Sequence, residues 1–111
     1  MNSIWAESKL WQGIVPLSGP SKLYAPTLTS NGQVKIENVF LANIGSAPVT
    51  IWLWTGITAL DGNVIFPGTE IKGNTLWVPR VVLYLGNGES VWGQASVEAV
   101  VCLTLNGGVR Q

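Results

Sequence analysis

Few side chains in this 111-residue sequence could take part in chemistry. There is no histidine, so the chain lacks the commonest general base, the usual partner of a nucleophilic Ser or Cys, and the commonest transition-metal ligand. A pair of carboxylates brought together by folding could still hydrolyse a glycosidic bond. Solvated loop and edge positions are the commoner role of such residues. The six carboxylates are dispersed along the chain: Glu7, Glu37, Asp61, Glu70, Glu89 and Glu98.

The single cysteine and the glycine-rich turns give no stronger indication of catalysis or metal binding. Cys102 lies in an apolar stretch, where a free cysteine usually behaves as a small hydrophobe, and a single cysteine cannot form an internal disulfide. Asp61-Gly62-Asn63 is only a fragment of a calcium loop and reads more simply as a turn. We therefore predict a protein that is not an enzyme, with no catalytic residue, metal site or cofactor.

Six tryptophans are the most informative residues. Trp52 and Trp54 share one side of a strand whose other side is aliphatic, so one of the two apolar faces should point away from the core. Alternation with their neighbours could bring Trp77 and Trp92 into the same outward patch. We predict an interface formed by these residues and two near the N-terminus, which together are Trp5, Trp11, Trp52, Trp54, Trp77 and Trp92.

Three roles remain open for these indoles. They could pack inside their own chain, as large apolar residues mostly do. They could be buried against neighbouring subunits, where Trp is enriched among the residues that dominate binding. They could instead stack on a glycan, with polar groups beside the rings. Candidate polar groups are Asn63, Asn74, Asn87 and Gln94.

Composition favours association with other chains. Charged residues make up 11% of the sequence, against about 25% in ordinary soluble domains, and the formal net charge is zero. Such a surface tends to associate. The basic residues form no cluster, so nucleic acid is not an expected partner. The N-terminal residues lack a continuous apolar run, so we expect no secretory signal there.

The elements that must hold these residues read as short strands. Residues 38–60 contain no charge and are long enough to raise the question of a membrane span. The alternation on both sides of a Gly-Ser-Ala-Pro turn favours a hairpin instead, and no membrane is expected. In the first strand of that hairpin the even-numbered residues from Val34 to Ala42 should share one side. Further strands are expected over 64–66, 75–78, 81–85, 90–95 and 99–105.

Regular short strands without helical runs predict a single antiparallel β-sandwich or jelly roll over residues 21–111. Residues 1–20 show no strand alternation and contain two prolines and two tryptophans. We expect an N-terminal arm and linker there, with Trp5 and Trp11 anchoring the arm on its own domain or on a neighbour.

From about Lys22 onward, the sequence resembles small all-β virion proteins of tailed bacteriophages. The resemblance covers about four fifths of the chain. It consists of turn and strand punctuation: Leu23-Tyr24-Ala25-Pro26, VKIENVFLANIGSAPVTIWLW from Val34 to Trp54, Gly73-Asn74-Thr75-Leu76, the element from Leu85 to Val91, and GQASVEAVVCLTLNG.

This resemblance implies a virion structural protein assembled in the host cytoplasm. The function it implies is a capsid decoration protein, with a tail-associated protein or a glycan-binding adhesin as alternatives. Expected partners are the chain itself, as a homotrimer, and the major capsid or tail proteins. Glycan remains a possible ligand.

Overall fold

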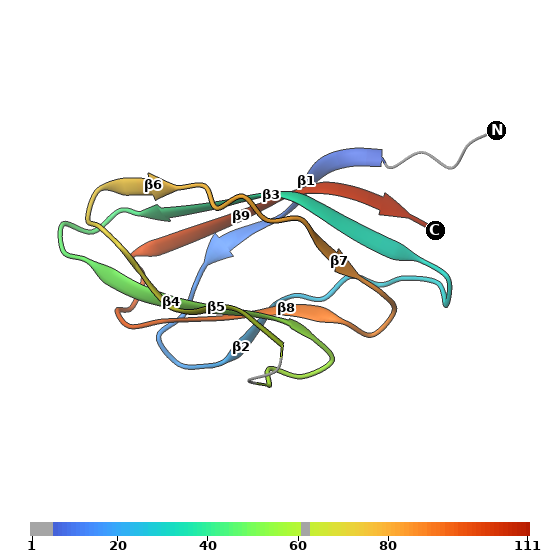
Figure 1. Cartoon of the computed structure of the whole chain (residues 1–111), viewed down its shortest axis with the longest axis horizontal. Coiled ribbons are helices and arrows are strands. Elements are labelled where there is room, and N and C mark those ends of the chain that lie inside the picture. The colour runs from blue at the N-terminus through green and yellow to red at the C-terminus, as the bar shows by residue number, and fades with distance from the viewer. Residues whose placement is uncertain (1–5, 61–62) are drawn as a thin grey trace.

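The computed structural model describes residues 6–60 and 63–111, which form two antiparallel β-sheets packed face to face (Figure 1). The larger sheet orders its strands β1-β9-β3-β6, with β7 also beside β3; the smaller orders them β2-β8-β4-β5. The predicted all-β sandwich is therefore confirmed. The strands are β1 (Ala6–Ile14), β2 (Ser21–Tyr24), β3 (Gln33–Asn43), β4 (Val49–Gly56), β5 (Val64–Ile71), β6 (Thr75–Trp77), β7 (Leu83–Leu85), β8 (Ser90–Ala95) and β9 (Val101–Arg110).

The strand order is that of a jelly roll. β6 and β7 both pair with β3 and together fill one strand position, so each sheet has four positions. Successive strands alternate between the sheets in the first half of the chain, as in the double Greek key. One consequence concerns the charge-free segment over residues 38–60. Its two strands form as predicted, but β3 and β4 belong to different sheets and do not pair.

The predicted hairpin is therefore wrong, although both of its strands and its turn are present. The aliphatic sides of β3 and β4 face each other across the core, which is how both strands bury them. Sequence alternation shows that each strand has an apolar side, but it does not distinguish a neighbour within one sheet from a neighbour across the sandwich. Among the described residues, no helix is long and apolar enough to cross a membrane.

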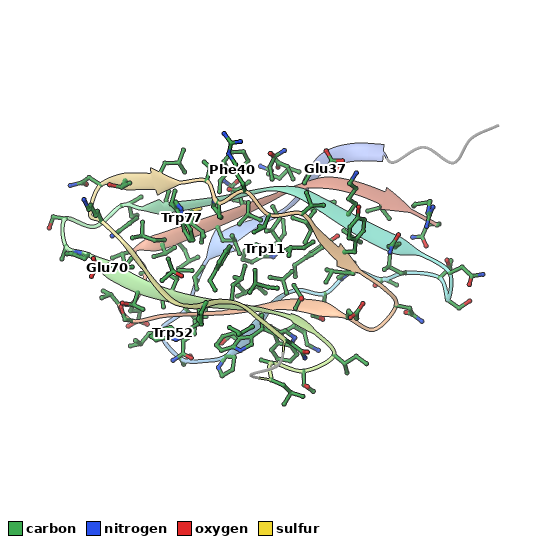
Figure 2. The ribbon with its side chains drawn as sticks, viewed as in Figure 1. Trp11, Glu37, Phe40, Trp52, Glu70 and Trp77 are labelled. Atoms are coloured by element: carbon green, nitrogen blue, oxygen red, sulfur yellow. The ribbon has the colours of Figure 1, made fainter. Side chains whose placement is uncertain are left out.

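β4 follows the alternation read from its sequence. Val49, Ile51 and Leu53 are fully buried and belong to the core cluster. Trp52 lies on the opposite side and is half-buried. Its side chain projects from the outer surface of the smaller sheet in Figure 2. The β-branched and aliphatic side of this strand thus supplies the core, as expected for a pleated strand with two apolar faces.

β3 departs from its predicted alternation. A bulge falls between Ile36 and Asn38, where the pairing with β9 shifts by one residue. Because side chains alternate with a period of two, one extra residue exchanges the two faces. Val39 and Leu41 therefore enter the core, and Phe40 and Ala42 turn outward.

Two strands run further than their sequences indicated. β5 continues through Pro67, which is tolerated because β5 is an edge strand with a bulge at this point. β9 continues beyond residue 105, where the predicted strand ends, and passes through Gly107 and Gly108. Gly107 fits there because a Cβ would collide with the carbonyl group of Lys35 in β3.

Where we expect an arm over residues 1–20, the structure has an edge strand from Ala6 onward. β1 pairs with β9 over its whole length, with a bulge between Lys9 and Trp11. Trp11 packs against the core cluster of its own chain. The bulge interrupts the period of two, which is why the segment shows no clear strand pattern.

Candidate functional site

The carboxylates whose side chains the structure describes, Glu37, Glu70, Glu89 and Glu98, show no contact that would make a catalytic pair. Glu37 lies on the outer face of the larger sheet, where its Oε1 is 3.2 Å from Lys35 Nζ. Glu70 belongs to β5 of the smaller sheet, and Figure 2 shows it far from Glu37 on the other layer. Glu89 Oε1 accepts a hydrogen bond from the Gly86 amide at 2.6 Å and so closes a turn. Asp61 lies outside the described residues.

The cysteine is not a core residue. Cys102 alternates along β9 with Val101 and Leu103, which are fully buried, and its own side chain is half-buried on the outer face of the larger sheet. This position on β9 corrects the expectation that Cys102 packs as a buried hydrophobe.

The described parts of the chain contain no group of three or more His, Cys, Asp or Glu side chains that could hold a metal ion.

Three of the tryptophans lie on the outer face of the smaller sheet. Trp54 is directly opposite Trp92 across β4 and β8, and Trp52 is opposite Gln94. Trp54 is only 8% exposed, yet it lies outside the core cluster. The prediction that Trp52 and Trp54 lie opposite the aliphatic side of β4 agrees with this geometry.

Local contacts hold these indoles against their own sheet. Trp92 Nε1 donates a hydrogen bond to the Gly56 carbonyl oxygen at 3.0 Å, and Lys22 Nζ lies 5.3 Å from the centre of the Trp92 ring. Trp52 packs so closely over Gly68 that a Cβ there would come within 3.0 Å of its Nε1. We call Trp52, Trp54 and Trp92 the tryptophan row. These contacts show that the row is partly covered within one copy of the chain.

Trp77 differs from the prediction. It packs against the core cluster and contacts Phe66, so it does not join the outward aromatic patch. Trp11 likewise packs on the core, and Trp5 lies outside the described residues. The sequence could not fix these orientations, because alternation shows which residues share a side without showing which side faces inward.

The polar residues proposed as partners for a stacked sugar do not surround the tryptophan row. Gln94 lies beside Trp52. Asn63 donates its side-chain amide to the Thr58 carbonyl, within its own loop. Asn74 occupies a turn with φ of 54°, and Asn87 lies in the turn before β8.

Four exposed apolar side chains gather elsewhere, on residues 75–85. Alternate residues of this segment point outward: Leu76 is 59% exposed, Val78 44%, Val82 53% and Tyr84 51%. We call these four residues the exposed stripe. Trp77, Val81 and Leu83, which lie between them, and Leu85, which follows them, pack in or against the core. The sequence feature that could have revealed this stripe is the nearly continuous apolar run LWVPRVVLYL, residues 76–85. Both sets of alternating residues in this run are mainly apolar.

The exposed stripe joins an apolar row that crosses the larger sheet. Ile14 pairs with Cys102, Cys102 with Ala42, and Ala42 with Leu76, so these four side chains lie side by side on the outer face. Phe40 lies on the same face, one step further along β3, and is labelled there in Figure 2. We call Ile14, Phe40, Ala42, Leu76, Val78 and Cys102 the apolar half of this face.

The other half of the same face is polar. A shallow hollow lies where the bulges of β1 and β3 flank Asn106 of β9. The side chains that line this hollow include one cation, Lys9, and one anion, Glu37. Lys9 Nζ also donates a hydrogen bond to Gln12 Oε1 at 3.1 Å. The hollow is lined by Ser8, Lys9, Glu37, Asn38, Thr104, Asn106 and Gly107.

Comparisons with known proteins assign no family. No protein-family model matches the chain, and no curated protein matches it. A similar solved structure is a chain from Bacillus endospore appendages, described as a novel family of disulfide-linked pili. The two are 14% identical with a TM-score of 0.45, over 97% of this chain and 91% of that chain. At this TM-score the likeness carries no statement about what the present chain does.

The expected bacteriophage identity is withdrawn: no family model and no curated protein matches the chain, and the similar solved structure named above is described as an endospore appendage and not as a virion protein. The capsid decoration, tail-associated and glycan-binding adhesin functions are withdrawn with it. So are the location in a virion assembled in the host cytoplasm and the capsid and tail partners. The all-β architecture that the resemblance implied stands on the strand order of the chain itself.

Proposed function

We propose that this protein is a non-enzymatic building block that associates with further copies of itself. The observation that carries the proposal is the exposed stripe. Residues 75–85 are apolar on both sides, and the chain covers the side that includes Trp77 and Leu83. Leu76, Val78, Val82 and Tyr84 on the other side remain open to solvent. A segment with two apolar faces needs two covers, and another subunit can provide the second.

The charge distribution supports the same proposal. Twelve charged residues are few for a surface of 6065 Å². Arg80 is the one charged residue within the segment that carries the stripe, and it is exposed between Val78 and Val82. Association through this stripe therefore has a single cation of its own segment to accommodate, and desolvation of charge is the costly part of forming an interface.

The half-buried tryptophans of the smaller sheet are a second place where subunits could meet. Trp52 and Trp92 retain some exposure on that outer face. Trp11 and Trp77 pack against the core, so they support the contact surfaces from inside the chain. The homotrimer was implied only by the bacteriophage resemblance, and a measurement of the mass of the assembly in solution would give the stoichiometry.

Sedimentation velocity of the full-length protein tests the proposal. We expect an oligomer at micromolar concentration. Val82→Lys should shift it toward monomer, because the substitution puts an unpaired charge in the contact. Val97→Lys is the matched control, since Val97 is similarly exposed at 42% but lies in the loop before β9. A wild type that stays monomeric throughout, or an equal effect of both variants, would contradict the proposal.

A further inference from the structure

We propose that a second copy of this chain docks face to face on the outer surface of the larger sheet, with Cys102 of each copy opposite Ala42 of the other. This inference rests on the proposed self-association and names the surface and the arrangement. It is carried by four observations: the form of the sheet edges, the shape of the apolar row, the separation of charge on the face, and the area of the face.

The edges of both sheets are poorly suited to pairing with another chain. β1 carries a bulge between Lys9 and Trp11, and β5 contains Pro67 at a further bulge. β2 is four residues long and lies between Pro20 and Pro26. The segment joining β6 to β7 contains Pro79. Short strands, prolines and bulges are the usual means by which proteins prevent edge-to-edge pairing, so association should use a face.

The apolar row has a shape that can match itself. Large side chains stand at its two ends, Ile14 and Leu76, and the small side chains of Cys102 and Ala42 lie between them. A two-fold axis running along the strands between β9 and β3 brings Cys102 of each copy opposite Ala42 of the other. The same axis brings Ile14 opposite Leu76. The contact is then isologous, with each surface meeting its own equivalent.

Charge on this face is separated from the apolar half. Lys35 and Glu37 form an ion pair 3.2 Å long beside the polar hollow, and Lys9 lines the hollow itself. None of the six residues of the apolar half is a Lys, Arg, Asp or Glu. An apolar centre with a polar border is the usual composition of a protein interface.

The face is large enough for a stable dimer only if most of it is used. Four strand positions about 4.8 Å apart and a strand of ten residues at about 3.3 Å each give roughly 630 Å² before side-chain relief is counted. A standard interface covers about 800 Å² on each partner. The apolar half alone is too small, so the polar half should take part as the border of the contact.

Crosslinking through Cys102 tests the arrangement, because facing sheets pack about 10 Å apart and their side chains meet between them. A bismaleimide with a spacer of about that length should join two copies of the wild type covalently. Cys102→Ser should abolish the product. Leu76→Lys, at an exposed position, should lower the crosslinked fraction at least about tenfold while a monofunctional maleimide still labels Cys102 fully.

Val97→Lys again serves as the matched control and should crosslink like the wild type. An oligomer by sedimentation whose Cys102 neither crosslinks nor is protected from the monofunctional reagent would overturn this inference and leave the proposed self-association standing. Unchanged crosslinking in Leu76→Lys would also overturn it. A monomer by sedimentation would overturn both.

Discussion

Phe66 of β5 and Trp77 of β6 pack with their ring centres 5.0 Å apart and their planes inclined by 56°. The contact joins the two sheets, because β5 belongs to the smaller sheet and β6 to the larger. It also fixes the direction of the exposed stripe. With Trp77 held inward, its neighbours Leu76 and Val78 must point outward.

Trp77→Ala should therefore destabilise the fold and disturb the stripe together. We expect a loss of about 3 kcal/mol, at the low end for truncating a large aromatic residue because Trp77 is only half-buried. Urea unfolding followed by tryptophan fluorescence measures it. Trp77→Phe keeps a ring against Phe66 and should lose clearly less. An equal loss in both variants would show that the ring contact is not the source of the stability.

Asn43 should be sensitive to the loss of its amide group. It is 2% exposed, and its Nδ2 lies within hydrogen-bond distance of the Ala47, Ile71 and Lys72 carbonyl oxygens at 2.9, 3.1 and 3.2 Å. Its Oδ1 accepts from the Gly45 amide at 2.9 Å. Asn43→Ala should cost about 3 kcal/mol, because the buried Ile71 carbonyl and three partly buried backbone groups lose their partner.

Asn43→Asp adds a pH dependence with a defined sign. An ionised carboxylate cannot donate to these carbonyl groups, so burial beside them should raise the pKa of the new side chain in the folded state. The variant should then be most stable below the ordinary Asp pKa of about 4 and lose stability as the pH rises. Denaturation at pH 4 and pH 7 measures the difference from wild type. A variant that tracks wild type at both pH values would contradict the assigned hydrogen bonds.

Tyr24 predicts a change of stability in alkali. Desolvation by burial raises the pKa of its phenol above the ordinary value of 10.0. The folded state therefore holds the proton more tightly than the unfolded state, so this contribution is complete below pH 10 and is lost as the pH rises through the folded pKa. Comparison of wild type with Tyr24→Phe at pH 9 and pH 11 isolates it. The wild type should lose more stability than the variant over that interval.

The alternation in β4 was sufficient to identify which residues share each of its two faces. Its aliphatic residues lie in the core and Trp52 lies outside, a choice between the two apolar faces that the alternation alone left open. The scarcity of charge and the absence of histidine are equally fixed by the sequence. The strand alternation predicts the all-β class, and the scarcity of charge predicts an apolar surface that favours association.

The faces of β3 and the direction of Trp77 could not be read in the same way. One extra residue between Ile36 and Asn38 moves Phe40 and Ala42 outward, and only the pairing with β9 shows where that residue lies. Trp77 points inward because Phe66, from the other sheet, offers it a ring to pack against.

The sequence by itself therefore determined which residues lie on the same side of each regular strand. The tertiary structure decided which side is covered, because coverage depends on bulges and on partners that are distant along the chain. The exposed stripe and the apolar half of the larger sheet follow from those partners, and strand periodicity alone could not place them.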